Sequence, residues 1–379
     1  MGLSNNILKF LTQKAKIQRI PMTVNFELLP VCNLNCKMCY IRSSWDDVNK
    51  NGGLHSIDDW LDIAKQAKEA GTLCILLTEG EVFLYPDFKK LYIELHKMGF
   101  IITINTNASL IDENVIEWLK DYPPKCVSIS LYGADNDTYE ALYGAKNIFT
   151  KVDHAIQLLQ KNHIAIECKT ILTRFNYQDL EKCYQYTKKH QINYEVAPYS
   201  FPAVRKTCPK QYKRLTPEEV VDYTFYRNKL MSTKTQYQQE IIKYLKKYQK
   251  TKSIPGKDIC GLSCSASNTS CWITWDGKMT CCALLPIPFT NPYKIGFFNA
   301  WEQLKIECDK LSLSKTCSHC NKREICAVCP ASAYGETRQI NGTSKHHCQM
   351  TDGLLEKMMI YCKNNNINID DYDENGERI

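Results

Sequence analysis

The chain lacks a long apolar run, an apolar segment near its start and any low-complexity tract. Nowhere do about 18 apolar residues follow one another, which excludes a membrane-spanning helix. Residues 1–19 carry Lys9, Lys14, Lys16 and Arg19 without an apolar core, so they do not form a secretory signal. We therefore expect a cytoplasmic protein with no membrane partner.

A strong excess of one charge is also missing. Lysine and arginine number 48 against 41 aspartate and glutamate residues, which gives a formal net charge of +7. The basic residues are scattered except around 243–252, where a solvent-facing helix is expected rather than a nucleic-acid surface. The contents of 44% apolar and 23% charged residues are those of a globular protein with an ample core.

Cysteine is abundant. The chain has 20 cysteines in 379 residues, about 5%, which is below the level of a small disulfide scaffold. Because no export signal is present, the thiols should stay reduced. Clustered cysteines then indicate metal ligands rather than disulfides.

Three cysteines form a compact group, Cys32-x3-Cys36-x2-Cys39, followed by Tyr40. A structural zinc site needs four nitrogen or sulfur ligands, and the next histidine is His55. Three thiolates can instead hold a [4Fe–4S] cluster with one iron free for another ligand. The group resembles the motif of the radical S-adenosylmethionine (radical SAM) superfamily. The resemblance implies that the free iron chelates the amino and carboxylate groups of SAM, and that Tyr40 lies near its adenine. Half of a zinc knuckle is the alternative.

Strand-like and helix-like patterns alternate over the first half of the chain. Strands are expected at 24–30, 72–78, 100–105, 126–131, 164–172 and 192–198, and helices at about 57–70, 88–98, 113–120, 138–142, 151–161 and 177–190. Six such repeats with short connections predict an α/β fold with a parallel sheet covered on both faces. The resemblance implies a partial (β/α)6 TIM-type barrel, and a doubly wound open sheet is the alternative. In both folds, chemistry belongs at the C-terminal ends of the strands.

Changes in composition divide the chain into five parts. They are an N-terminal helix (1–22), the barrel (23–215), a helical bridge (216–257), a small cysteine-rich domain (258–350), and a C-terminal helix and tail (351–379).

The segment after the second expected strand, residues 78–82, partly matches the Gly-Gly-Glu-Pro motif by which the radical SAM family binds the SAM ammonium group. Gly80 and Glu81 match this motif, whereas Glu79 and Val82 depart from it. A glycine permits close backbone approach and an unusual φ, so Glu79 should alter how SAM is held. Its carboxylate either attracts the SAM cation or faces solvent.

Three further residues lie where the family contacts SAM. Asn107 belongs to a sequence resembling Thr-Asn-Gly, Ser130 ends the fourth expected strand, and Lys169 on the fifth could neutralise the SAM carboxylate. Each could instead be a turn residue, a buried hydroxyl or a surface lysine. No catalytic base is evident; Glu195 is one candidate, and a structural carboxylate is the alternative.

From residue 260 to residue 348 the chain carries eleven cysteines. The pattern is Cys264-x12-Gly277-x4-Cys282, then Cys317-x2-Cys320-x5-Cys326-x2-Cys329, and finally Cys348. It resembles the SPASM extension of peptide- and protein-modifying radical SAM enzymes, with x2 in place of x3 at one spacing.

The resemblance implies two auxiliary [4Fe–4S] clusters. One would be bound by Cys264, Cys282 and Cys329, and the other by Cys317, Cys320, Cys326 and Cys348. The fourth ligand of the first cluster is open among Cys260, Cys271, Cys281 and no protein residue. Zinc is the alternative, because C-x2-C pairs are ordinary zinc-ribbon spacing. Residues 272–277 predict a β-hairpin with an Asp-Gly turn that places Cys282 beside the first cluster.

These features imply an oxidoreductase in which reduction of the first cluster cleaves SAM to a 5′-deoxyadenosyl radical. We expect it to oxidise or cross-link a residue of a ribosomally made peptide. An anaerobic sulfatase-maturing enzyme and a non-catalytic zinc protein are the alternatives. The expected partners are a peptide or protein substrate and an electron donor such as flavodoxin or ferredoxin. The roughly 22 residues before the first strand are expected to be too few for a leader-recognising domain. A peptide maturase would then use a separate recognition protein, or none.

Overall fold

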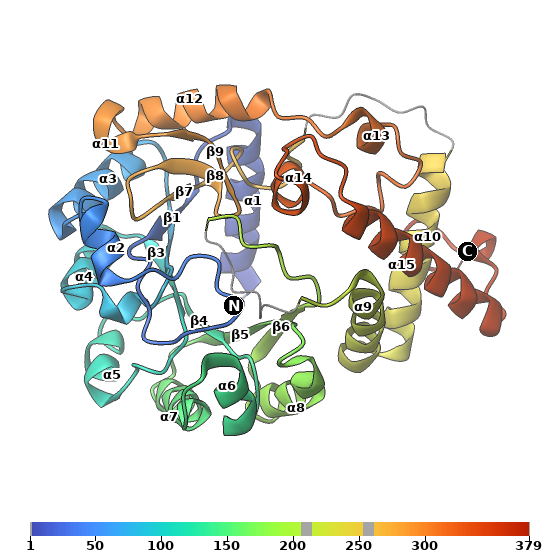
Figure 1. Ribbon diagram of the computed structural model, residues 1–379, viewed down its shortest axis with the longest axis horizontal. Helices are drawn as coiled ribbons and strands as arrows, with labels where there is room; N and C mark the ends of the chain where they lie inside the picture. The colour runs from blue at the N-terminus through green and yellow to red at the C-terminus, as the bar shows by residue number, and fades with distance from the viewer. Residues whose placement is uncertain (1, 206–213, 253–260, 379) are drawn as a thin grey trace.

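The computed structural model describes residues 2–205, 214–252 and 261–378 (Figure 1). Its centre is a nine-stranded sheet with the order β6-β5-β4-β3-β2-β1-β7-β8-β9. The six strands of its first part are β1 (Thr23–Glu27), β2 (Cys74–Thr78), β3 (Ile101–Thr106), β4 (Cys126–Ser130), β5 (Ile166–Ile171) and β6 (Asn193–Ala197).

Strands β1 to β6 pair in parallel with their sequence neighbours. Parallel strands need long crossovers, and here each crossover contains a helix on the outer side of the curved sheet (Figure 1). These helices are α3 (Ile57–Glu69), α4 (Phe88–Lys97), α5 (Glu113–Leu119), α6 (Asn136–Tyr143), α7 (Ile148–Lys161) and α8 (Leu180–Lys189). The edge strands β6 and β9 are not paired to each other. The expected partial barrel is therefore confirmed.

Helix α3 illustrates why these segments fold as they do. The Ser56 hydroxyl accepts a hydrogen bond from the Asp59 backbone nitrogen, and the Asp59 carboxylate accepts one from the Ser56 backbone nitrogen. The two bonds form a capping box at the start of the helix. The residues buried on this helix, Trp60, Ile63 and Ala67, recur at the helical spacing. The Trp60 ring lies 4.8 Å from the Phe26 ring of β1. Phe26 therefore faces the outer helices, and its neighbours in the strand face the barrel interior.

The cysteine-rich part of the chain continues the barrel sheet. Strands β7 (Ser270–Ile273) and β8 (Met279–Cys282) form the expected antiparallel hairpin, and β9 (Leu285–Thr290) follows. Strand β7 pairs in parallel with β1, a contact that the sequence did not reveal. The hairpin thereby covers the edge of β1, whose backbone groups would otherwise lack partners.

The helical bridge consists of two helices. Helix α9 (Pro217–Met231) ends before Ser232, and α10 (Lys234–Lys252) begins after a two-residue break. Both helices contact α15 (Lys345–Asn364) to one side of the barrel (Figure 1). The expected boundary after residue 350 falls inside α15. Among the described helices, none combines the length and the apolar character that crossing a bilayer requires.

Helix α1 (Gly2–Gln18) matches the expected N-terminal helix. Several other elements were not expected. Helix α2 (Trp45–Lys50), for example, follows the cysteine loop without a clear sequence signal. The remaining elements are α11 (Pro292–Ile295), α12 (Phe297–Asp309), α13 (Lys315–Ser318), α14 (Pro330–Thr337) and the 3-10 helices η1 (Val82–Leu84), η2 (Tyr177–Asp179) and η3 (Ile369–Asp371).

Candidate functional site

The loops that follow β1, β2 and β3 meet at the C-terminal edge of the sheet. The strand register aligns Glu27 with Thr78, so the segments after these residues emerge side by side. Asn107, just after β3, donates from its amide nitrogen to the Cys32 Sγ at 3.6 Å and to the Asn33 Oδ1 at 3.0 Å. The expected meeting of Cys32 and Asn107 at this edge is therefore found.

Cys32, Cys36 and Cys39 are half-buried and form no disulfide. Backbone N–H groups point at two of the sulfurs. The Leu34 nitrogen lies 3.4 Å from the Cys32 Sγ, and the Arg42 nitrogen lies 3.1 Å from the Cys39 Sγ. Burial raises the pKa of Cys32 to about 11, so a thiolate here needs a compensating positive charge, which a bound metal centre supplies.

The cysteine triad supplies three thiols, one fewer than the four ligands of a structural zinc site. Within the described parts of the chain, no three His, Cys, Asp or Glu side chains converge on one point that could hold a single metal ion. A zinc ion would gather its ligands around one centre at about 2.3 Å from each sulfur. A cubane cluster instead spreads its thiolates over separate iron atoms.

Gly80 allows the β2 loop to press against the cysteine loop. Its φ is +37°, and a Cβ atom at this position would lie 2.1 Å from the carbonyl oxygen of Val31. The next residue, Glu81, donates its backbone N–H to the same oxygen at 3.0 Å. Position 80 therefore requires glycine, because its backbone packs directly against Val31, the residue before Cys32.

The carboxylate of Glu81 ties the β2 loop to the β3 loop. Its side chain is 0% exposed and accepts hydrogen bonds from the Thr106 hydroxyl at 2.8 and 2.9 Å. It also accepts from the backbone nitrogens of Asn107 at 2.9 Å and Phe83 at 3.3 Å. The side chain therefore positions Asn107 through the protein's own donors, and its contact with SAM stays a prediction.

Burial raises the pKa of Glu81 to about 7 from its ordinary value of 4.5. The folded chain then holds this proton more tightly than the unfolded chain, so stability should fall as the pH rises from about 4.5 through about 7. We expect Glu81→Gln to remove up to about 3 kcal/mol of this pH dependence. Urea unfolding of both proteins at about pH 5 and about pH 8 measures it. Equal pH dependence in the two proteins would contradict the assignment.

Glu79 occupies the position of the family's first glycine. It keeps the left-handed backbone, with a φ of +82°. Its Oε1 accepts a hydrogen bond from the Tyr40 hydroxyl at 2.7 Å, and burial raises the pKa of its carboxyl. The side chain therefore does not turn to solvent; it holds the aromatic residue that follows the cysteines.

Two residues of this region were missed from the sequence. Glu27, at the end of β1, is 0% exposed, and both of its oxygens accept from the Arg205 Nη1 at 2.6 and 2.7 Å. Burial raises the pKa of Glu27, and Arg205 partly offsets this effect. A carboxylate at the end of a buried strand was the available signal for Glu27. Nothing in the sequence pointed to Arg205, 178 residues away.

Lys169 lies beside two carboxylates. Its Nζ lies 2.9 Å from the Glu167 Oε1 and 3.5 Å from the Glu195 Oε2. The neutralisation of the SAM carboxylate by Lys169 stays a prediction. Ser130 lies opposite Lys169 in the strand register and is half-buried. Glu195 faces Lys169 from the neighbouring strand β6, and its role as a catalytic base stays a prediction.

Four of the last five cysteines of the pattern gather around one cavity of about 80 Å³ between α13 and α15. The cysteines among its lining residues are Cys317, Cys320, Cys326 and Cys348. This is the set that the sequence assigned to the second auxiliary cluster. Four unpaired thiols facing one small cavity suit the ligand set of a [4Fe–4S] cluster.

The first auxiliary set is also brought together. The sulfurs of Cys264 and Cys329 lie close enough to Cys282 to raise the pKa of its thiol, an effect smaller than that of burial. The Cys281 thiol points to that of Cys308 on α12, with which it forms a hydrogen bond.

The structure narrows the choice of a fourth ligand for this set. In the strand register Val24 pairs with Cys271, which is buried on the helix side of the sheet. The Cys281 thiol is directed at Cys308. Cys260 lies outside the described residues.

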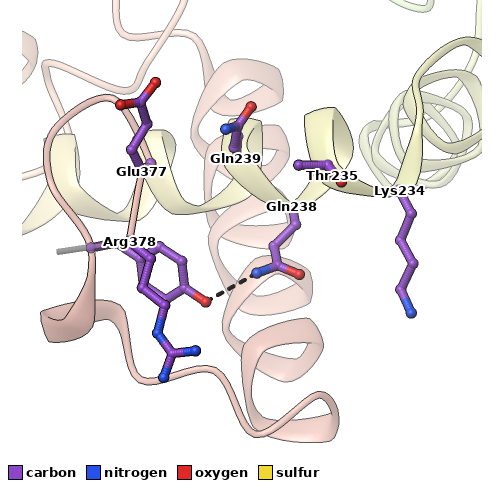
Figure 2. A pocket seen from close by; sticks show the side chains of 8 residues that line it. Lys234, Thr235, Gln238, Gln239, Glu377 and Arg378 are labelled. Carbon is purple, nitrogen blue, oxygen red and sulfur yellow. Dashed lines mark hydrogen bonds between the residues drawn. The ribbon is translucent and has the colours of Figure 1, made fainter.

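Two cavities lie near the surface. One of about 400 Å³ is bordered by the cysteine loop, Arg205 and Trp275 of the hairpin turn. The other, of about 460 Å³, lies between the start of α10 and the C-terminal tail, where the Gln238 side chain donates to the Tyr372 hydroxyl at 3.1 Å (Figure 2). Only the first adjoins the strand-end site.

Residues 26–186, which include the cysteine triad and most of the partial barrel, match the family model of the radical SAM superfamily. This segment is therefore similar to radical SAM domains, for which a [4Fe–4S] cluster and SAM are the implied cofactors.

Two curated proteins match this sequence at low identity. The AdoMet-dependent heme synthase of Methanosarcina barkeri is 22% identical over 84% of this chain and 93% of its own length. The antilisterial bacteriocin subtilosin biosynthesis protein AlbA of Bacillus subtilis is 29% identical over 39% of this chain and 32% of its own length.

Solved structures share the fold. Streptococcus suis SuiB bound to S-adenosylmethionine superposes with a TM-score of 0.64 at 19% identity, covering 89% of this chain and 78% of SuiB. The anSMEcpe protein with bound AdoMet also has a TM-score of 0.64, at 20% identity, covering 92% of this chain and 96% of anSMEcpe. The comparison confirms an open barrel followed by a C-terminal domain.

Proposed function

We propose that this chain is a radical SAM enzyme that oxidises or cross-links a residue of a ribosomally made peptide. The observation that carries the proposal is the arrangement of cysteines in three separate groups. One group lies at the strand ends, one lies around Cys282, and one surrounds the cavity between α13 and α15. The relative named for bacteriocin biosynthesis and the SuiB structure bound to its precursor peptide support a peptide substrate.

When bound, the first cluster and SAM supply hydrogen-atom abstraction by a 5′-deoxyadenosyl radical. The chain's own residues orient and shield this chemistry. Asn107 and the Leu34 backbone donate to the Cys32 sulfur, which stabilises a thiolate ligand. Glu79 holds Tyr40 in place, where the ring would lie against the adenine. Glu81 fixes the β2 and β3 loops around the site.

The two further cysteine groups would hold auxiliary clusters that accept an electron from the substrate radical. Because Cys271 is buried on the helix side of the sheet and the Cys281 thiol is hydrogen-bonded to Cys308, the first auxiliary cluster would keep an iron open or use Cys260. We further propose a flavodoxin or ferredoxin as electron donor and a separate protein that recognises the leader peptide. Formylglycine formation on a sulfatase remains the alternative substrate reaction, supported by the anSMEcpe fold.

A reaction like that of the heme synthases is a second candidate, because the match to the Methanosarcina barkeri protein covers 93% of its length. The described interior of the barrel favours a peptide instead. Glu27, Glu79, Glu167 and Glu195 line or border it, and Arg205 and Lys169 are already paired with carboxylates. A heme-sized macrocycle needs a wide apolar slot, whereas this wall is polar and acidic.

The proposal is tested by anaerobic reconstitution with iron and sulfide, followed by dithionite and SAM. We expect about twelve iron atoms per chain, from three [4Fe–4S] clusters, and formation of 5′-deoxyadenosine. A colourless protein with about two zinc ions and no SAM cleavage would identify the non-catalytic zinc protein instead. Addition of a heme precursor, a sulfatase peptide or a cysteine-rich precursor peptide then separates the candidate substrates.

The second auxiliary group gives a separate prediction. We expect Cys320→Ser to lose about four iron atoms and to abolish product formation, while 5′-deoxyadenosine is still released. Iron analysis and chromatography measure the two effects. Cys362→Ser is the control, because Cys362 is buried against α10 and should retain all the iron. Loss of SAM cleavage in Cys320→Ser with the first cluster intact would contradict the separation of roles.

A further inference from the structure

Arg205 lies between Tyr40, which follows the cysteine triad at the strand ends, and the hairpin that carries Cys282. The residue follows β6, its guanidinium lies 5.8 Å from the Tyr40 ring, and its Nη1 binds the Glu27 carboxylate. Its Nε donates to the carbonyl oxygen of Ala283 at 3.0 Å. One side chain thus contacts the end of β1, the residue after the cysteine triad and the residue after Cys282.

The surroundings of Arg205 explain why it adopts one conformation. Its side chain is 16% exposed, and that of Glu27 is 0% exposed. A second carboxylate, that of Glu79, also interacts electrostatically with Arg205. The Glu79 carboxylate accepts a hydrogen bond from the Tyr40 hydroxyl. An arginine paired with a fully buried carboxylate is strongly fixed, because removing it would leave the Glu27 charge uncompensated.

We infer that Arg205 is a positioning residue shared by two sites: with Glu27 and Glu79 it sets the orientation of Tyr40, and through Ala283 it fixes the end of the strand that carries Cys282. The inference rests on the proposed function, because it assigns Tyr40 to the SAM side and Cys282 to an auxiliary cluster. It adds a physical connection between the two sites that the cysteine pattern does not contain.

The connection predicts that Arg205→Lys changes two measurements at once. Lysine keeps the charge that faces Glu27 but cannot reproduce the fork that also reaches Ala283. We expect SAM binding to weaken about three- to tenfold, measured by equilibrium dialysis on the reconstituted protein. We also expect the electron paramagnetic resonance signal and the midpoint potential of the first auxiliary cluster to shift, which loss of packing on the SAM side alone would not cause.

Tyr40→Phe tests the SAM side with a smaller change. It keeps the ring and removes the hydroxyl that binds Glu79, so it should weaken SAM binding about three- to tenfold and leave the auxiliary cluster signal unchanged. Arg174→Lys is the matched control. At the surface, the Nε and a terminal nitrogen of Arg174 both donate hydrogen bonds to the Glu219 carboxylate. Replacing Arg174 should change neither SAM binding nor the auxiliary cluster signal.

The outcomes separate this inference from the proposed function. If the wild-type protein binds no iron or releases no 5′-deoxyadenosine, the proposed function fails. If the wild-type protein cleaves SAM but Arg205→Lys behaves like Arg174→Lys, the shared role of Arg205 is wrong. If Arg205→Lys does not retain its clusters, the test rests on Tyr40→Phe. Unchanged SAM binding in Tyr40→Phe would then overturn the inference.

Discussion

Replacing Cys36 with serine is expected to reduce 5′-deoxyadenosine formation to the level of a reaction without protein. Cys36 belongs to the half-buried loop that follows β1, and burial raises the pKa of its thiol well above the ordinary value. A serine hydroxyl is a poor ligand for iron in such a place, since soft thiolates select iron–sulfur clusters. The variant should lose about four of about twelve iron atoms and keep the auxiliary clusters.

The control for this experiment is Cys74→Ser. Cys74 is also half-buried, but it begins β2 and therefore lies at the opposite end of the strand from the site. Its replacement should leave both the iron content and SAM cleavage unchanged. If Cys36→Ser still releases 5′-deoxyadenosine at the wild-type rate, the cysteine triad is not the centre of the chemistry.

Gly80→Ala is expected to have the second largest effect. The added Cβ would lie 2.1 Å from the Val31 carbonyl oxygen, at a φ of +37°. Because the obstructing atom belongs to backbone, the β2 loop must move away from the cysteine loop. Strain of the left-handed residue and the overlap together should cost about 3 kcal/mol or more of unfolding free energy. Iron of the first cluster should be lost as well.

Gly99→Ala separates the overlap from the backbone strain. Gly99 also has a left-handed φ, of +84°, but a Cβ there would meet nothing within 4 Å. We expect this variant to lose about 1 kcal/mol and no iron. Urea unfolding and iron analysis of the two variants measure the difference. Similar losses in both would show that contact between the β2 and cysteine loops does not matter.

The barrel was predictable because its signals are local. The alternation of apolar strands with capped helices, such as the capping box of Ser56 and Asp59, fixed the order of the elements within a few residues. Parallel strands then had to bring their C-terminal ends together, so Cys32 and Asn107 could be placed near each other before any coordinates were known.

Long-range pairing was not predictable for the opposite reason. Strand β7 gives no sign in its own sequence that it pairs with β1, about 250 residues earlier. The bond between Glu27 and Arg205 likewise joins distant segments. Lys169 looked free on its strand, and only the register of β5 with β6 brings Glu195 beside it. Glu79 could not be oriented because its partner, Tyr40, comes from another loop.

The central claim is that the thiolates of Cys32, Cys36 and Cys39 leave one iron vacant for SAM. Electron–nuclear double resonance on the reduced protein, mixed with SAM labelled by ¹⁵N in its amino group, tests this most directly. The account predicts a nitrogen coupling to the cluster that Cys36→Ser abolishes and Cys74→Ser retains. A reduced cluster that shows no coupling to the labelled nitrogen would contradict it.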